Sequence, residues 1–112
     1  MLLKDKVAVV TGATRGIGRA VAFALAAQGA HLVVVGTQAE KAAAVAAEIE
    51  QCGSRALGVG ADISRADDVE RLVESAKEHF GRIDILVNNA GVTRDGLMLR
   101  MKEDDWDIVL DV

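Results

Sequence analysis

A glycine-rich stretch at residues 11–18 has the residue types needed to bind a phosphate group. It reads Thr-Gly-Ala-Thr-Arg-Gly-Ile-Gly and follows an apolar run at 7–10. Backbone N–H groups at the start of a helix point toward an anion, and the helix dipole favours negative charge there. Gly12, Gly16 and Gly18 lack the Cβ atoms that would keep a pyrophosphate away from the backbone. A strand, this turn and a following helix predict a phosphate-binding site. The alternative is a turn that only packs the helix on a sheet.

The spacing of these glycines separates the stretch from two other phosphate-binding motifs. It is Gly-x-x-x-Gly-x-Gly, and Val21 stands where the third glycine of Gly-x-Gly-x-x-Gly would fall. No Gly-Lys-Ser/Thr follows, so the stretch is not a Walker A loop. We interpret it as a dinucleotide-binding loop of a different spacing.

Composition narrows the class of protein. The 112 residues are 51% hydrophobic and 27% charged, with a formal net charge of −4, no proline and one cysteine, Cys52. These values fit one globular domain, and the negative charge argues against nucleic acid as the main partner. The sequence shows no apolar run of about 18 residues and no signal-peptide layout, so we expect a cytoplasmic protein without a membrane partner. His31 and His79 have no partners at metal-ligand spacing, so no metal site is expected.

Apolar runs alternate with helix-period segments along the chain. Ile17, Val21 and Leu25 recur every four residues, as they do on one face of a helix. Strands that are apolar along their whole length indicate a parallel sheet covered on both faces, and right-handed crossovers give the strand order 3-2-1-4. The expected fold is α/β: a three-layer half of a Rossmann domain, with a four-stranded parallel sheet and helices on both faces. The strands are expected at 6–11, 31–36, 55–61 and 83–88, and the helices at 16–28, 37–52 and 65–80.

Helix-start signals add finer expectations. A loop with a short helical piece is expected at 92–102, and the acidic residues 103–105 suit the N-terminus of a last helix. That helix would carry the apolar set Trp106, Val109 and Leu110. Two capping boxes are predicted at the starts of the second and third helices, Thr37 with Glu40 and Ser64 with Asp67.

Three motifs in this order resemble the short-chain dehydrogenase/reductase family. They are the glycine loop at 11–18, Asp62-Ile63 after the third strand, and Asn88-Asn89-Ala90-Gly91 after the fourth. The resemblance spans the whole chain. The segment 91–101, followed by Trp106, looks like the 3-oxoacyl-acyl-carrier-protein reductases of fatty-acid synthesis. The resemblance therefore implies an NADPH-dependent reduction of 3-oxoacyl thioesters to 3-hydroxyacyl thioesters.

The resemblance also implies a role for each matched position. The glycines would form the turn against the pyrophosphate, with the Ile17 N–H as a donor. Asp62 would accept a hydrogen bond from the adenine amino group, and Ile63 would pack against the ring. Residues 89–91 would line the ribose and nicotinamide side of the cleft, whereas Asn88 is as well explained by a tie between neighbouring strands. The expected cofactor-binding set is Gly12, Thr14, Arg15, Gly16, Ile17, Gly18, Thr37, Asp62, Ile63, Asn89, Ala90 and Gly91.

Charge at the end of the second strand predicts which cofactor is preferred. NAD-specific relatives carry an acid there that binds the ribose hydroxyls. This chain has the neutral pair Gly36-Thr37, with Arg15 close by in the glycine loop. An arginine forms charge-assisted hydrogen bonds to a 2′-phosphate, and Thr37 adds a hydroxyl. We therefore expect NADP(H).

The catalytic residues of the family are the part that the sequence lacks. Relatives use an Asn, a Ser, a Tyr and a Lys together, and this chain contains no tyrosine. The resemblance thus implies the N-terminal, cofactor-binding half of a reductase, cut in the helix after the fourth strand, with no catalytic residue and no turnover of its own. We expect a homo-oligomer through the exposed fourth strand and the last helix, or association with a missing C-terminal half. The alternative is a structural, self-assembling fragment that does not bind cofactor.

Overall fold

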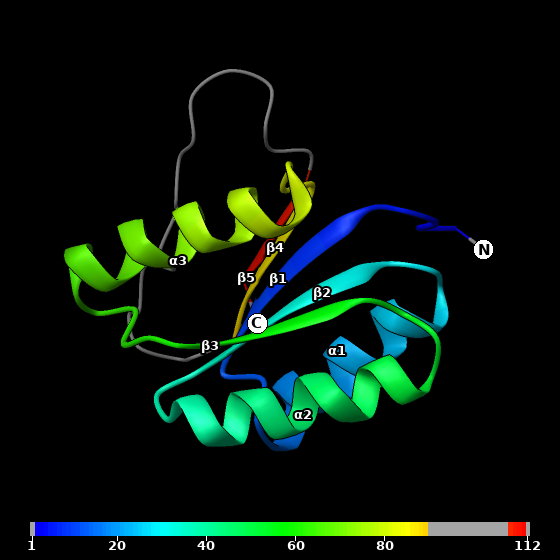
Figure 1. Cartoon of the computed structure of the whole chain (residues 1–112), viewed down its shortest axis with the longest axis horizontal. Coiled ribbons are helices and arrows are strands. Elements are labelled where there is room, and N and C mark those ends of the chain that lie inside the picture. Colours follow the sequence, from blue (N-terminus) through cyan, green and yellow to red (C-terminus); the bar gives the residue numbers. More distant parts are fainter. Residues whose placement is uncertain (1, 90–107, 112) are drawn as a thin grey trace.

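The computed structural model describes residues 2–89 and the secondary structure of residues 108–111. Strands and helices alternate along the chain until β4, and a further strand follows (Figure 1). The elements are β1 (Val7–Thr11), α1 (Gly16–Ala27), β2 (His31–Gly36), α2 (Ala39–Gln51), β3 (Ala56–Gly60), α3 (Ala66–Phe80), β4 (Ile85–Asn88) and β5 (Ile108–Asp111). Among the described helices none is long and apolar enough to cross a membrane.

The strands form one parallel sheet between two layers of helices. Its order is β3-β2-β1-β4-β5, so the expected order 3-2-1-4 is confirmed for the first four strands. In Figure 1, α1 and α2 lie on one face of the sheet and α3 on the other. All five residues of β1 are buried, because both faces of this central strand are covered.

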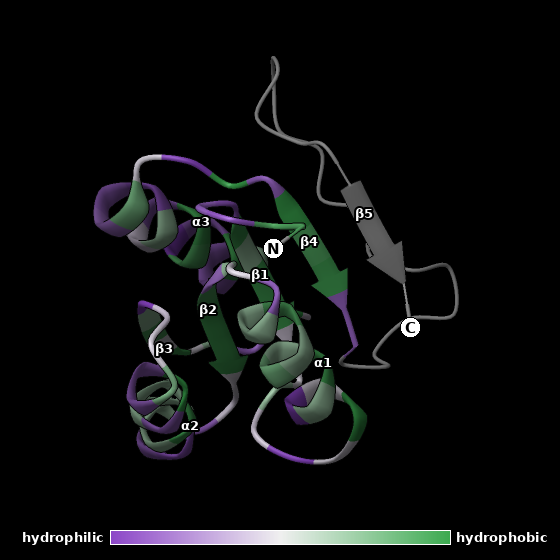
Figure 2. Ribbon diagram, turned by 90° about the vertical axis from the view of Figure 1, so that its right-hand side faces the viewer, coloured by the Kyte–Doolittle hydropathy of each residue, from purple (hydrophilic) through white to green (hydrophobic). Residues whose placement is uncertain are grey.

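Alternate residues of the strands supply two separate cores. Ala8, Val10 and Leu32 face α1 and α2, where helix alanines such as Ala22 and Ala42 meet them. The other alternation faces α3; there Val7, Val9, Val33 and Val35 pack with Leu72 and Ala76. Figure 2 shows hydrophobic strands inside and hydrophilic outer sides on α2 and α3.

Helix α2 lies very close to β3. A Cβ added to Gly58 would stand 2.6 Å from the backbone of Ala42, and one added to Gly60 would stand 2.9 Å from Ala39. Real Cβ contacts of this length do not occur, so both glycines are needed for the observed spacing. The start of α2 therefore rests on the sheet through backbone contact.

The C-terminal part of the chain corrects one expectation. Residues 108–111 form β5, which pairs in parallel with β4 from Ile85↔Ile108 to Asn88↔Asp111. The helix expected to continue through Val109 and Leu110 is therefore wrong at these positions. An unpaired β4 would leave its backbone N–H and C=O groups without partners, and an apolar, β-branched segment satisfies them by pairing. This pairing accounts for the strand at residues 108–111.

The fifth strand also changes the expected association. β4 lies between β1 and β5, so it presents no bare edge for a dimer. The helical piece at 92–102 and the helix start at 103 lie outside the described residues, as does Trp106.

The two predicted capping boxes are wrong as well. α2 begins one residue after Gln38 and α3 one residue after Arg65, and neither residue caps its helix with a side chain. Thr37 and Ser64 precede these N-cap positions. Thr37 lies at the end of β2 beside the cavity described below, and Ser64 donates hydrogen bonds to Asp62. Helix ends are predicted correctly where glycine allows a left-handed turn, as at Gly81 with φ 83°.

Candidate functional site

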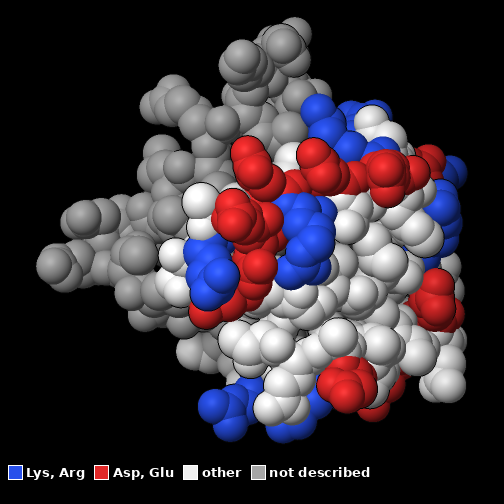
Figure 3. All heavy atoms as spheres, turned by 60° about the vertical axis from the view of Figure 1, so that its left-hand side comes forward, with Lys and Arg blue, Asp and Glu red and all other residues white. Residues whose placement is uncertain are grey.

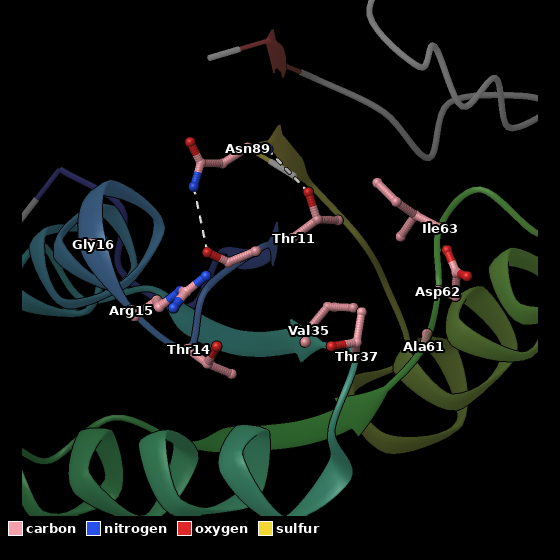
Figure 4. A pocket seen from close by; sticks show the side chains of 12 residues that line it. Thr11, Thr14, Arg15, Gly16, Val35, Thr37, Ala61, Asp62, Ile63 and Asn89 are labelled. Carbon is pink, nitrogen blue, oxygen red and sulfur yellow. Dashed lines mark hydrogen bonds between the residues drawn. The ribbon is translucent and has the colours of Figure 1, made fainter. Parts of the chain in front are cut away.

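A cavity of about 480 Å³ opens at the carboxyl ends of β1, β2 and β3 (Figure 4). In a parallel α/β sheet this edge is where ligands bind, because loops and helix N-termini converge there. The glycine loop forms one side of the cavity and the turn after β3 forms the other. The lining residues are Thr11, Gly12, Thr14, Arg15, Gly16, Val35, Gly36, Thr37, Ala61, Asp62, Ile63 and Asn89.

The glycine loop is held in place by the sheet and by α1. Gly12 and Gly16 have φ of 61° and 62°, a region that L-residues with a side chain rarely adopt. The Ala13 N–H donates to the carbonyl oxygen of Val35 at 3.0 Å, which ties the loop to β2. At Gly18 an added Cβ would lie 2.0 Å from the carbonyl oxygen of Gly12, so α1 starts in direct contact with the loop.

The N-terminus of α1 offers backbone donors beside the cavity. Its N-cap, Arg15, makes no side-chain capping bond, and no acidic residue stands in the first turn. The first N–H groups of a helix have no intrahelical partner, so they are free to bind an anion or water. Ile17 in this turn is 65% exposed, which is unusual for a large apolar side chain. The local geometry thus has the features of an anion site.

Two asparagines at the end of β4 have different tasks. Asn88 is 6% exposed and its Oδ1 accepts a hydrogen bond from the Thr11 hydroxyl at 3.1 Å. It ties β4 to β1, which was the structural reading of this residue. The Asn89 N–H donates to the Thr11 Oγ1 at 2.9 Å, and its Nδ2 donates to the Gly12 carbonyl oxygen at 3.3 Å (Figure 4). Asn89 therefore lines the cavity and also supports the glycine loop.

The opposite wall of the cavity is a tight turn after β3. The Asp62 Oδ1 accepts hydrogen bonds from the Ser64 hydroxyl at 2.6 Å and from the Ser64 N–H at 3.0 Å. These bonds lower the pKa of Asp62 below its usual value, with the hydroxyl as the larger cause. The carboxylate is thus ionised at neutral pH and accepts hydrogen bonds at the cavity edge. Next to it, Ile63 is 6% exposed and joins the core under α3.

A second hollow of about 530 Å³ adjoins the first and is basic. Its lining residues are Thr14, Arg15, Thr37, Gln38 and Lys41. No acidic residue lines this hollow in the described part of the chain. The residues come from the glycine loop and from the beginning of α2, whose N-terminus adds its dipole. The hollow has the charge and the hydroxyl donors that suit a phosphate group.

The structure brings together most, but not all, of the predicted site residues. Thr14, Arg15 and Thr37 border both hollows, and Gly12, Gly16, Asp62, Ile63 and Asn89 line the first. Ile17 and Gly18 stand in the first turn of α1, outside the lining set. Ala90 and Gly91 lie outside the described residues.

Several lining residues were missed by sequence reasoning. Val35, near the end of β2, and Ala61, just after β3, were not expected, and the rule that parallel strands end at one edge would have found them. Lys41 stands in the first turn of α2, and a basic residue so close to the end of β2 is the signal that could have placed it at the second hollow.

Surface charge and possible metal ligands were compared over the described residues. On the face shown in Figure 3, acidic and basic side chains are interleaved over the described surface. Residues 2–89 hold no cluster of His, Cys, Asp and Glu that could bind a metal ion. His31 stacks on Phe80 at 5.9 Å between ring centroids, so it belongs to a structural aromatic contact. Cys52 is exposed at the end of α2.

Comparison with known proteins agrees with this arrangement. Residues 6–112 match the short chain dehydrogenase family. A 3-oxoacyl-acyl-carrier-protein reductase of Synechocystis sp. is 52% identical over 111 residues, covering 98% of this chain and 45% of that protein. The short-chain reductase protein NovJ of Streptomyces niveus is 49% identical, covering 97% of this chain and 42% of that protein.

Solved structures of dehydrogenases are also similar to this chain. The crystal structure of a hydroxysteroid dehydrogenase from Escherichia coli matches with a TM-score of 0.76 and 40% identity, covering 80% of this chain and 37% of that one. A 7α-hydroxysteroid dehydrogenase complexed with NADH and 7-oxo glycochenodeoxycholic acid matches with a TM-score of 0.77 and 40% identity, covering 80% of this chain and 35% of that one. The chain belongs to the short-chain dehydrogenase/reductase family. It spans less than half the length of the curated relatives described above.

Proposed function

We propose that this chain binds NADP(H) across the two hollows and forms the cofactor-binding part of a short-chain reductase. The observation that carries the proposal is the continuity of the glycine-loop cavity with a basic hollow at the end of β2. Arg15 and Thr37 border both spaces. The pyrophosphate then lies against the glycine loop and the α1 N-terminus, and the 2′-phosphate lies between Arg15, Thr37 and Lys41.

The adenosine end of the cofactor fits the opposite wall. The Asp62 carboxylate would accept a hydrogen bond from the adenine amino group, and Ile63 would pack against the ring. Asn89 would border the ribose on the nicotinamide side while it holds the glycine loop. Ala90 and Gly91 are proposed to continue that side. The bound nicotinamide supplies a hydride, and the residues named here bind and orient the cofactor.

The preference for NADP(H) over NAD(H) follows from charge. An acid at the end of β2 would bind the ribose hydroxyls of NAD(H) and repel a 2′-phosphate. Thr37 stands at this place, and two cations border the hollow beside it. A phosphate there gains charge-assisted hydrogen bonds that the ribose hydroxyl of NAD(H) cannot make.

We further propose that the parent reaction is reduction of a 3-oxoacyl thioester to a 3-hydroxyacyl thioester. In that reaction the hydride goes to C3 and a proton goes to the carbonyl oxygen. The 112-residue chain contains no tyrosine, which the family uses as the proton donor. We therefore expect the chain by itself to show no turnover. NADPH-dependent reduction of an acetoacetyl thioester by the purified chain would overturn this expectation.

Calorimetric titration of the chain with NADPH and, separately, with NADH tests the cofactor proposal. Tighter binding of NADPH supports it, and equal or tighter binding of NADH contradicts the preference. Absence of binding by both would favour the alternative of a structural fragment that does not bind cofactor. Self-association and a cytoplasmic location stay predictions, and a strictly monomeric mass by light scattering would contradict the first.

A further inference from the structure

The turn that forms the adenine side of the cavity is tied to α3 from behind. The Asp62 N–H donates to the Oδ2 of Asp68 at 2.8 Å. Asp68 stands in the first turn of α3 and lines neither hollow. Its carboxylate thus reaches back over six residues to the backbone of a cavity residue.

Asp68 is itself held by a second side chain. The Arg71 Nη2 lies 3.1 Å from the Asp68 Oδ1, and the Arg71 Nη1 donates to the carbonyl oxygen of Gly60 at 3.2 Å. Gly60 is the last residue of β3, so Arg71 connects the strand end with Asp68. The Asp62 N–H and Arg71 lower the pKa of Asp68, with the N–H as the larger cause.

Other hydrogen bonds also hold the Asp62 turn. The Asp62 carbonyl oxygen accepts a hydrogen bond from the Arg65 N–H at 3.0 Å, and the Ala61 N–H donates to the Gly36 carbonyl oxygen at 2.8 Å. Ser64 binds the Asp62 Oδ1. The bond from the Asp62 N–H is the one that a side chain of α3 makes to this turn.

We propose that Asp68 is a positioning residue that sets the preference of the site for an adenine base. It acts through the Asp62 N–H, and it touches no ligand. This inference rests on the proposed function, because it takes Asp62 as the acceptor for the adenine amino group. When Asp68 loses its carboxylate, the turn shifts and the Asp62 Oδ2 no longer meets that amino group squarely.

Asp67 provides a matched control. It is exposed, it lies in the same first turn of α3, and it carries the same charge. Each of the substitutions Asp67→Ala and Asp68→Ala therefore removes one negative charge and one favourable interaction with the helix dipole. Only the second removes the acceptor of the Asp62 N–H. Asp68→Asn keeps an acceptor oxygen and serves as the conservative variant.

The experiment compares NADPH with its deaminated analogue, in which hypoxanthine replaces adenine. The calorimetric affinity ratio of the two measures recognition of the amino group, and general loss of stability lowers both affinities together. Asp68→Ala is expected to reduce this ratio by about two- to tenfold, the range for one hydrogen bond. Asp67→Ala is expected to keep the ratio, and Asp68→Asn to recover most of it.

Amide hydrogen exchange in the free chain measures the bond between Asp62 and Asp68 independently of cofactor binding. The Asp62 amide is expected to exchange faster in Asp68→Ala and at the original rate in Asp67→Ala. If the wild-type chain binds neither nucleotide, the proposed function fails, and the assignment of Asp68 to adenine selection fails with it. If the wild-type chain discriminates and Asp68→Ala keeps the same ratio or the same Asp62 exchange rate, the positioning role alone is overturned.

Discussion

Asn89 donates its side-chain amide to the carbonyl oxygen of Gly12 at 3.3 Å, which joins the end of β4 to a loop 77 residues earlier. The same residue donates its N–H to the Thr11 hydroxyl. The glycine loop thus keeps its shape through a contact from a distant strand, in addition to its own backbone geometry. The pairing of β4 with β1 therefore places the side chain that supports the glycine loop.

Removal of this amide is expected to weaken cofactor binding more than folding. Asn89→Ala leaves the Gly12 carbonyl without its donor, and a lost hydrogen bond corresponds to about two- to tenfold in affinity. Calorimetric titration with NADPH measures the effect. Gln28→Ala, which removes an exposed amide that accepts a hydrogen bond from the Leu2 N–H, is the control and should bind as the wild type does. Equal NADPH affinities of Asn89→Ala and the wild type would contradict the prediction.

A methyl group at Gly18 is expected to disrupt the loop. The added Cβ would stand 2.0 Å from the Gly12 carbonyl oxygen and 2.5 Å from the Asn89 Nδ2. Overpacking of this kind costs about 1–3 kcal/mol of unfolding free energy. Gly18→Ala should therefore lower the denaturant midpoint and abolish measurable NADPH binding.

Gly81→Ala separates loss of stability from loss of the site. Gly81 has φ 83° at the end of α3, and a Cβ there meets nothing within 4 Å. Forcing alanine into this conformation costs about 1–2 kcal/mol. This variant should lose stability and still bind NADPH, and parallel loss of binding in both variants would contradict the assignment of Gly18 to the loop.

A carboxylate at position 37 is expected to reverse the cofactor preference. Thr37→Asp would bind ribose hydroxyls and repel the 2′-phosphate, and its position just before α2 favours an acid. Thr37 is exposed, so NADPH affinity should fall by about three- to tenfold, because the new carboxylate replaces a hydroxyl donor with a charge that repels the phosphate. NADH affinity should stay or rise.

Lys41 is expected to contribute to the same discrimination. Lys41→Gln should lower NADPH affinity a few-fold and leave NADH unchanged, and the difference should shrink at high salt because exposed charges are screened. Lys4→Gln removes a lysine outside both hollows and is the control. An equal effect of the two substitutions would show that only net charge matters.

The Asp62 turn is expected to loosen in acid. The pKa values of Asp62 and Asp68 are lower in the folded chain than the usual aspartate value. Each carboxylate therefore stabilises the fold above the pKa of an unfolded aspartate, about 3.9. That contribution is lost as the pH falls through the lowered pKa values.

Ser64→Ala tests the cause of the Asp62 shift. It removes the hydroxyl donor and leaves the backbone N–H, so the pKa of Asp62 should rise toward its usual value while the pKa of Asp68 stays low. An NMR titration of the side-chain carboxyl carbons measures both groups. An unchanged pKa of Asp62 in this variant would contradict the hydrogen-bond explanation.

The fold was predictable where local pattern and long-range pairing agree. Apolar strands such as β2, with Leu32 to Val35, are buried on both faces, and this pattern requires a parallel sheet. β5 was not predictable in this way, because the acidic residues at 103–105 favour a helix locally. The apolar run Ile108-Val109-Leu110 suits a strand or a helix, and the need of β4 for a partner, which acts across the sheet, decides between them.

The residue types of the candidate site were predictable from the sequence. The hydrogen bonds that hold these residues in place were less predictable. The glycine loop and Asp62 carry their chemistry in the sequence. The bonds from Asn89 to Gly12 and from Asp68 to Asp62 depend on side-chain direction, which spacing alone does not fix. At Thr37 the local sequence was misleading, because Thr37 and Glu40 have the spacing of a capping box. α2 begins after Gln38, and Thr37 lines the two hollows instead.

The backbone contact of α2 with Gly58 and Gly60 has a consequence for how such a site can evolve. The start of α2 is located by main-chain atoms of Ala39 and Ala42, so its position does not depend on its outward side chains. Residues around the second hollow, such as Thr37 and Lys41, are therefore open to exchange while the helix stays in place. We expect substitutions at these two positions to change the lining of the second hollow without moving α2, as long as the two glycines of β3 are retained.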